Sequence, residues 1–273
     1  HGLTSLMDVQ VTTQFKQVEV NIIEKNHPSK KLVKNCQETV CAFADILEPF
    51  DQIYNSVSLV EAGLITTPMN QQQCGMCWAF ATISSLENAM LVNYSSIPSF
   101  WQQQSINLSQ LFVGVNTYGK SNYCDGGNFI YAINYIAQYA TTVELQSNFP
   151  YTMDQVNQYQ TNFDNNITVP PAIDANNYFI PFKQFESDTM KTPLILLAAD
   201  TQQPFNTTSI KRIKSYLSRG IAVVAEMYVN ANEYKFATYR GGLLQAECQV
   251  YKVDHQVVIV GYGKYQGTDV WMF

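Results

Sequence analysis

The sequence predicts an α+β protein of two lobes, with a helical lobe over about residues 70–165 and a β-rich lobe over about residues 166–273. In the first lobe, apolar residues recur with helical spacing at Ile83, Leu86 and Met90. Helical character also marks residues 129–136. In the second lobe, residues 221–226 form a β-branched, strand-like run. A chain of 273 residues, 46% of them hydrophobic, can bury the cores of such a fold, and we expect a cleft between its lobes.

Cys77 lies where a polar loop gives way to the first helical run. Residues 70–73 are Asn-Gln-Gln-Gln, and apolar residues begin to recur at Ala79. We therefore expect Cys77 at a helix N-terminus, where unpaired backbone N–H groups and the helix dipole favour a thiolate. A free thiol of pKa about 8.5 can fall by several units there, above all beside an imidazolium. This position predicts a nucleophilic cysteine.

Cys74 and Cys77 also form a Cys-x-x-Cys pair. By itself this spacing fits a thioredoxin-like dithiol or half of a zinc site about as well as a hydrolase. A zinc site needs further ligands, and the rest of the chain offers only four other cysteines and three scattered histidines, so we expect no metal. A dithiol module would have a strand leading into the motif, whereas Gly63, Pro68 and a glutamine run precede it here. A dithiol redox protein is kept as a minor alternative.

The β-rich lobe carries the second reactive side chain. Residues 252–263 have the pattern of a buried, β-branched strand that is closed by Gly-Tyr-Gly, with His255 at its entry. A lone histidine is more often a satisfied core residue, but His255 is the only histidine that follows Cys77. One cysteine with a distant histidine is the sequence form of a catalytic Cys/His pair. The sequence therefore predicts that Cys77 and His255 meet across the cleft.

The order of motifs along the chain resembles the papain-like cysteine peptidases. Gln71 stands six residues before Cys77, and Cys-Gly-x-Cys-Trp-Ala-Phe over residues 74–80 is similar to that family's oxyanion glutamine and nucleophile signature. The segment 56–66 is similar to the start of the mature enzymes. Further matches follow in the family's order, at Leu108-Ser109-Gln110, Cys124-Asp125-Gly126-Gly127, Asn148-Phe149-Pro150-Tyr151, Tyr239-Arg240-Gly241-Gly242 and Val253-Asp254-His255. The resemblance implies the papain-like two-lobed fold, with a β-barrel-like second lobe and the cleft between the lobes.

The same resemblance implies a cysteine endopeptidase. Cys77 would attack the peptide carbonyl as a thiolate, and His255 as imidazolium would give a proton to the leaving amine, through an acyl-enzyme intermediate. The side-chain amide of Gln71 and the backbone N–H of Cys77 would donate to the oxyanion. The resemblance also pairs Cys74 with Cys124 in a disulfide, leaves Cys77 free, and makes Cys248 one half of another bridge.

Substrate contacts are implied in the same way. Gly126 and Gly127 would bond an extended peptide through their backbones, since a residue without Cβ allows close approach. The pocket for the side chain two residues before the scissile bond would be lined by Phe129, Val224, Ala225, Val253 and Gln256. Gln256 stands where a small residue is usual, so we expect a shallower or more polar pocket.

Both ends of the sequence differ from a complete enzyme of this kind. Residues 1–52 have the character of a pro-region tail or an N-terminal extension, in which Cys36 and Cys41 are close enough to bridge. The peptidase domain would occupy residues 53–273 and lack its C-terminal end, because the chain stops at Phe273 before the asparagine that orients the histidine in the family. We therefore expect a fragment.

Composition and sequons narrow the partners and the compartment. A net charge of −6 shows no nucleic-acid footprint, and the apolar runs are too short to span a membrane. Asn166 and Asn206 are the favoured glycosylation candidates. With the disulfides, they favour a secretory route to a lysosome-like or vacuolar compartment or out of the cell.

We expect a monomer that acts on peptides or proteins without a cofactor, and the resemblance adds cystatin-like inhibitors as partners. The alternative function is a catalytically silent papain-like protein that binds a peptide or a partner. Such proteins often replace the nucleophile, whereas Cys77, Gln71 and His255 are all present here.

Overall fold

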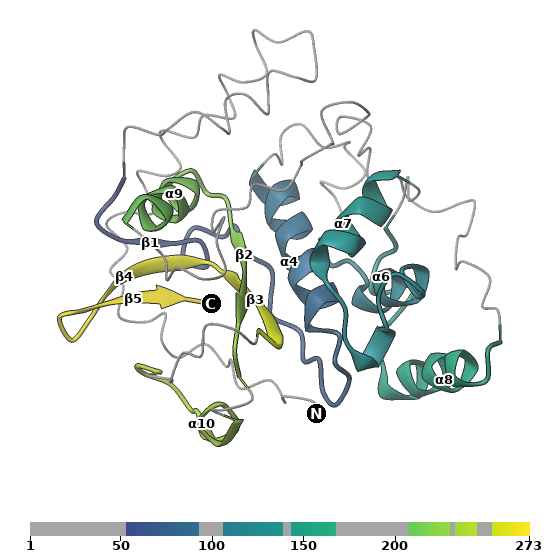
Figure 1. The fold of residues 1–273 in the computed structure, drawn as a ribbon. Helices are drawn as coiled ribbons and strands as arrows, with labels where there is room; N and C mark the ends of the chain where they lie inside the picture. Colours follow the sequence, from purple (N-terminus) through teal and green to yellow (C-terminus); the bar gives the residue numbers. More distant parts are fainter. Residues whose placement is uncertain (1–52, 93–105, 139–142, 168–206, 230–232, 245–252) are drawn as a thin grey trace, which may run out of the picture.

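The computed structural model describes residues 53–92, 106–138, 143–167, 207–229, 233–244 and 253–273. The helices between residues 77 and 164 gather on one side of the molecule, and the strands lie on the other side together with the helices between residues 207 and 238 (Figure 1). Each side has its own hydrophobic core: one is built from residues between 74 and 163, the other from residues near 57–65 and between 213 and 271. The expected α+β architecture with two lobes is confirmed at this level.

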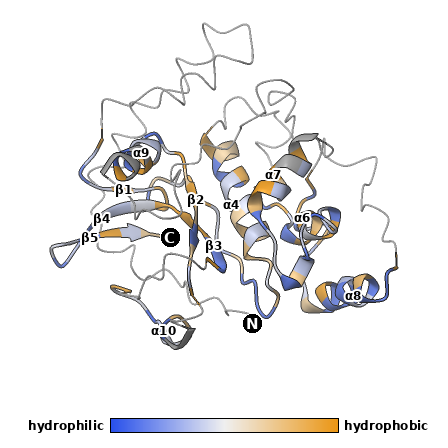
Figure 2. Ribbon diagram, in the orientation of Figure 1, coloured by the Kyte–Doolittle hydropathy of each residue, from blue (hydrophilic) through white to orange (hydrophobic). Residues whose placement is uncertain are grey.

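The first lobe is built around α4 (Cys77–Val92), which packs against α6 (Gln110–Asn116) and α7 (Phe129–Gln138). The short 3₁₀ turn η3 (Tyr123–Asp125) and α8 (Met153–Asp164) complete it. α8 is mostly hydrophilic, whereas α7 carries many hydrophobic residues (Figure 2). Ser109 and Thr152 cap α6 and α8 by accepting from backbone N–H groups in the first turn.

The second lobe contains two separate antiparallel ladders. β1 (Val57–Ser58), β4 (Gly261–Tyr265) and β5 (Thr268–Met272) form a sheet in the order β1-β4-β5. β2 (Val223–Met227) pairs with β3 (His255–Ile259). Two helices belong to the same part of the chain: α9 (Thr207–Ser218) precedes β2, and α10 (Glu233–Thr238) follows it. The described strands form no closed barrel. The barrel-like character of this lobe therefore stays a prediction.

The chain turns a corner directly after β3. The sequence predicted that Gly-Tyr-Gly would end the strand, but these residues open β4, and only Val260 separates the two strands. Val260 already belongs to the other sheet, because its N–H donates to Met272 O at 2.8 Å and its carbonyl accepts from Leu59 N at 2.8 Å. A Cβ on Gly261 would lie 2.3 Å from Val57 O. Glycine is therefore needed here for close backbone approach and not as a strand terminator.

Helix α9 was not predicted, since residues from about 166 onward were interpreted as loops and strand-like runs. Its Ile213 and Leu217 are buried against the second core and lie four residues apart, on one helical face. This spacing was the available signal. The apolar spacing was obscured by the threonines, serines and basic residues that occupy most other positions of the helix.

Several predictions fall on residues that the structure does not describe. These are the interpretation of residues 1–52 with Cys36 and Cys41, the glycosylation candidate Asn206, and Cys248. Within the described ranges, no helix has the length and apolar character that a membrane span requires.

Candidate active site

Cys77 is the first residue of α4, as the change from polar loop to apolar run predicted. The helix is started by the carbonyl of Met76, which accepts from Ala79 N at 2.8 Å and Phe80 N at 3.1 Å. The half-buried thiol of Cys77 is free, and the backbone N–H groups of Trp78 and Gln256 face it closely enough to lower its pKa. The Trp78 donor is part of the helix N-terminus, and the Gln256 donor comes from the other lobe.

His255 is the first residue of β3, the strand that packs against α4 where the lobes meet. The residue after it, Gln256, supplies the N–H that reaches the Cys77 thiol. The start of β3 is held by β2, since Met227 pairs with His255, and Asp254 N donates to Met227 O at 3.1 Å. The structure thus brings the two predicted reactive residues to the same junction between the lobes.

Burial dominates the electrostatics of both reactive groups. It raises the pKa of the Cys77 thiol, against the N–H donors of Gln256 and Trp78 that lower it, and the Asp254 carboxylate raises it further. Burial also lowers the pKa of His255, although Asp254 opposes this. The predicted fall in the Cys77 pKa is therefore wrong in direction, because loss of water outweighs the helix N-terminus. Burial disfavours a charge on either residue alone. The Cys77 thiolate and the His255 imidazolium are therefore stabilised when they form together as an ion pair.

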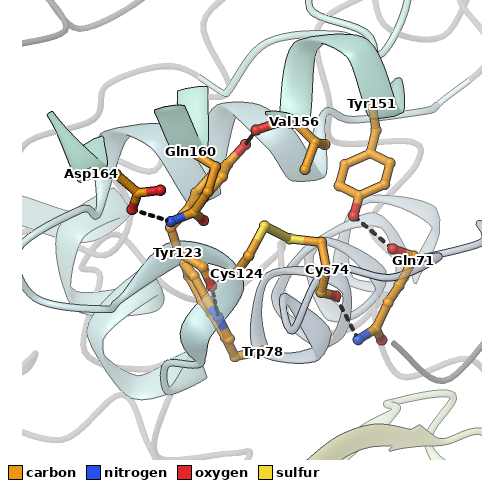
Figure 3. The surroundings of a disulfide bond; sticks show 9 residues. All are labelled: Gln71, Cys74, Trp78, Tyr123, Cys124, Tyr151, Val156, Gln160 and Asp164. Carbon is orange, nitrogen blue, oxygen red and sulfur yellow. Dashed lines mark hydrogen bonds between the residues drawn. A yellow bond between two sulfur atoms is a disulfide. The ribbon is translucent and has the colours of Figure 1, made fainter. Parts of the chain in front are cut away.

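Gln71 lies beside the disulfide that anchors the loop before α4 (Figure 3). The side-chain Nε2 of Gln71 donates to Cys74 O at 2.9 Å, and the backbone carbonyl of Gln71 accepts from the Tyr151 hydroxyl at 2.7 Å. The Tyr151 ring packs edge-on against Phe80, with centroids 4.9 Å apart. The Gln71 loop is therefore held by α4 and by the segment that leads into α8.

The disulfide joins Cys74 to Cys124, in agreement with the pairing that the resemblance implied. Gly75 N also donates to Cys124 O at 2.9 Å, so backbone and side chain both tie the nucleophile's loop to η3. Because Cys74 is bonded and Cys77 is free, the pair cannot act as an exchanging dithiol in this state. The redox alternative loses its main support.

Comparison with known proteins agrees with the family resemblance of the sequence motifs. The family model described as papain family cysteine protease matches residues 54–273. The chain belongs to the papain family. It is 27% identical to a cathepsin L-like proteinase of Fasciola hepatica, over 78% of this chain and 52% of that protein. It is 26% identical to procathepsin L of Rattus norvegicus, over 98% of this chain and 66% of that protein. A probable cysteine protease of Arabidopsis thaliana is 22% identical, over 89% of this chain and 56% of that protein. The chain thus spans about half the length of most of the curated relatives it matches.

The two glycines of the papain-family Cys-Asp-Gly-Gly segment differ in their surroundings. Gly126 has φ +110° and open space where a Cβ would point. On Gly127 a Cβ would lie 2.6 Å from both Ser121 Cβ and the Trp78 ring. Packing alone therefore requires glycine at Gly127, which is a reason that the sequence interpretation did not include. Gly126 uses its own backbone locally, since its N–H donates to Tyr123 O at 3.4 Å and its carbonyl accepts from Asn122 N at 2.7 Å.

The residues predicted to line the substrate pocket are only partly brought together. Phe129 and Gln256 meet directly, because Gln256 Oε1 accepts from Phe129 N at 3.1 Å. Val224 and Ala225 lie half-buried in β2, opposite β3, whereas the Val253 side chain is 56% exposed. Gln256 is buried and makes a second contact, with Nε2 donating to Glu226 Oε1 at 2.7 Å. Gln256 thus has polar partners on both sides, and the shallower or more polar pocket stays a prediction.

Two residues of this papain-family site were missed by the sequence interpretation. Glu226 lies in β2, and its Oε1 also accepts from Asn128 Nδ2 at 3.1 Å. The available signal was a single charge within the otherwise apolar run 221–227. Asn128 carried no signal of its own.

Two further predictions concern metals and glycans. Among the described residues, no group of three or more His, Cys, Asp or Glu side chains is placed to hold a metal ion. Asn166 is exposed just beyond the end of α8, with φ +54°. Its position is compatible with a glycan.

Proposed function

We propose that this papain-family chain forms the catalytic part of a cysteine endopeptidase. The observation that carries the proposal is the packing of α4 against β3, which brings the free Cys77 thiol beside the backbone N–H of the residue that follows His255. The neighbouring Cys74 is held in a disulfide, so of this Cys-x-x-Cys pair only Cys77 is available as a nucleophile.

The proposed reaction begins when the Cys77 proton passes to His255. The thiolate attacks the peptide carbonyl carbon, a C–S bond forms, and the carbonyl electrons move to oxygen. The imidazolium gives its proton to the amine, the C–N bond breaks, and a thioester remains. Water then gives a proton to His255 and attacks the thioester, and the imidazolium returns that proton to Cys77 as the acid leaves. Every proton in this sequence is thus supplied and taken up by Cys77, His255, water or the two products.

The oxyanion formed in this reaction needs hydrogen-bond donors. The backbone N–H of Cys77 is one candidate, because it lies at the start of α4. Gln71 Nε2 carries two hydrogens and uses one for Cys74 O, so the other can donate to the oxyanion. The bond to Cys74 fixes the orientation of the amide before substrate arrives.

The substrate is proposed to be an extended peptide or protein segment. Gly127 supports this because it is exposed, and a residue without a Cβ allows another main chain to approach closely. The side chain two residues before the scissile bond would enter the space bounded by Phe129, Val224, Ala225, Val253 and Gln256. The contact between Phe129 N and Gln256 supports one end of this set.

A thiol-directed epoxide peptide analogue tests the proposal on the full-length protein at about pH 5.5. We expect stoichiometric labelling at Cys77, mapped by mass spectrometry and lost after prior denaturation. The Cys77→Ser variant should lose hydrolysis of peptide amides and keep its thermal melting temperature. An accessible, reduced Cys77 that is not labelled would instead favour the silent, peptide-binding alternative. Hydrolysis by Cys77→Ser would overturn the assignment.

We also propose that the protein follows an oxidising route, to a lysosome-like or vacuolar compartment or out of the cell. The Cys74–Cys124 disulfide supports this, since such bonds persist in secretory compartments. Cystatin-like inhibitors and a monomeric state belong to the same proposal.

Removal of glycans from the natural protein should increase its gel mobility, and the shift should be smaller in Asn166→Gln.

A further inference from the structure

Glu226 places one carboxylate where the two lobes meet. Its Oε1 accepts from Gln256 Nε2 on β3 at 2.7 Å and from Asn128 Nδ2 at 3.1 Å. Asn128 directly precedes α7 in the helical lobe, while Glu226 and Gln256 are direct partners on the β2–β3 ladder. The carboxylate is therefore oriented by amide donors from both lobes.

One residue connects this carboxylate to the nucleophile. The backbone N–H of Gln256 faces the Cys77 thiol, and the side chain of the same residue donates to Glu226. An extended peptide advances about 3.3 Å per residue, so a side chain two residues before the scissile bond lies about 7 Å along the chain from it. Gln256, a single residue, thus lies between the nucleophile and the carboxylate.

The remaining oxygen of Glu226 is available to a ligand. Glu226 is exposed, and within the described ranges its Oε2 has neither a hydrogen bond nor an ion pair. The salt bridge of the described residues, Lys264 to Asp269, lies elsewhere, between β4 and β5. A carboxylate that is oriented through one oxygen, and whose other oxygen has no cationic partner among the described residues, is a site for a positively charged group.

We propose that Glu226 gives this site a preference for peptides with Lys or Arg two residues before the scissile bond. The proposal rests on the proposed peptidase function and adds its substrate class. One ammonium or one guanidinium N–H can bond Oε2, but Oε1 is occupied by two amides, so a bidentate arginine pair is not available. Lysine and arginine peptides should therefore be cleaved about equally well.

The preference should be moderate because the carboxylate is exposed to water. We expect kcat/KM for the Lys and Arg peptides to exceed that for a Met peptide by roughly fivefold at low salt. Higher ionic strength should reduce the ratio, since salt screens exposed charges. A Glu peptide should be the poorest substrate of the set.

The experiment measures kcat/KM of the full-length protein on fluorogenic peptides that differ only at this position, with Lys, Arg, Met or Glu, at low and high salt. Glu226→Gln is the matched variant, because its amide oxygen still accepts from Gln256 and Asn128 while the charge is removed. We expect it to lose the preference, so that the ratio of kcat/KM for the Lys and Arg peptides to kcat/KM for the Met peptide falls to about one. Asp154→Asn, on the exposed first turn of α8, removes one charge elsewhere and should keep the preference.

The outcomes separate this inference from the function on which it rests. Cleavage of all four peptides without a basic preference, or a preference that persists in Glu226→Gln, overturns the role of Glu226 and leaves the peptidase assignment intact. An equal loss on every peptide in a folded Glu226→Gln would show a general structural role and also overturn the inference. Absence of cleavage together with absence of Cys77 labelling overturns both.

Discussion

The Cys77 thiol is subject to opposing effects that come from different parts of the chain. The N–H groups at the start of α4 lower its pKa, and these could be predicted from the local sequence. Burial raises the pKa and arises when β3, far along the chain, closes over α4. The sequence identified the residue and its helix position but gave the wrong direction for its pKa, because burial depends on tertiary packing.

Gln71 offers a test of the site at the level of one residue. Replacing Gln71 with Ala removes the amide that is oriented by Cys74 O, and with it one proposed oxyanion donor. We expect kcat to fall by about 10²–10³ with KM changed little, because the donor acts mainly in the transition state. Steady-state kinetics on a peptide amide measure this.

Gln73 is the matched control, because it lies in the same loop with an exposed side chain. Gln73→Ala should retain wild-type kcat. Equal activity of the two alanine variants would show that Gln71 contributes no donor, whereas equal losses would indicate general damage to the loop.

At the scale of elements, α4 and β3 could be predicted and the connections around them could not. α4 begins at Cys77 and β3 at His255, where the apolar patterns placed them. The corner at Val260 depends on Gly261 approaching β1 closely, which is a tertiary contact with a segment near the other end of the chain. For the same reason, the bridge between Asn128 and Glu226 could not be found from spacing.

Glu87 makes α4 sensitive to pH. This buried carboxylate accepts from Leu108 N at 2.6 Å and from the Thr66 hydroxyl, yet burial raises its pKa from 4.5 to about 7. The folded protein therefore holds this proton more tightly than the unfolded chain. The resulting stability is complete below pH about 4.5 and is lost as the pH rises through about 7.

Glu87→Gln should remove this dependence, since a neutral amide can keep the bond to Leu108 N while the Thr66 hydroxyl rotates to accept. Between pH 5 and 7.5 we expect the free energy of unfolding of wild type to fall by roughly 2–3 kcal/mol relative to Glu87→Gln. Urea unfolding at the two pH values measures it, with the exposed Asp154→Asn as a control. Parallel changes in wild type and Glu87→Gln would mean that Glu87 does not titrate in this range.

At the scale of the whole molecule, the two hydrophobic cores have to be held in register for the site to form. Asn88 on α4 is 2% exposed and links them through its side chain. Its Nδ2 donates to Leu64 O at 2.9 Å and Gly220 O at 3.0 Å, and its Oδ1 accepts from Ala222 N at 2.9 Å. Leu64 and Ala222 pack against the second core, whereas α4 belongs to the first. A single amide thus joins the helical lobe to two segments of the β-rich lobe.

Asn88→Ala should therefore damage the connection between the lobes more than either lobe itself. The change leaves a buried N–H and two carbonyls without their partner, and we expect a loss of about 3 kcal/mol in the free energy of unfolding. Because the lobes have separate cores, calorimetry should show a broader transition as they unfold less cooperatively. Asn165→Ala removes one exposed bond at the end of α8, so it should cost less than about 0.5 kcal/mol. If Asn88→Ala were as stable as Asn165→Ala and melted as sharply as wild type, the lobes would have to be held together by apolar contacts alone.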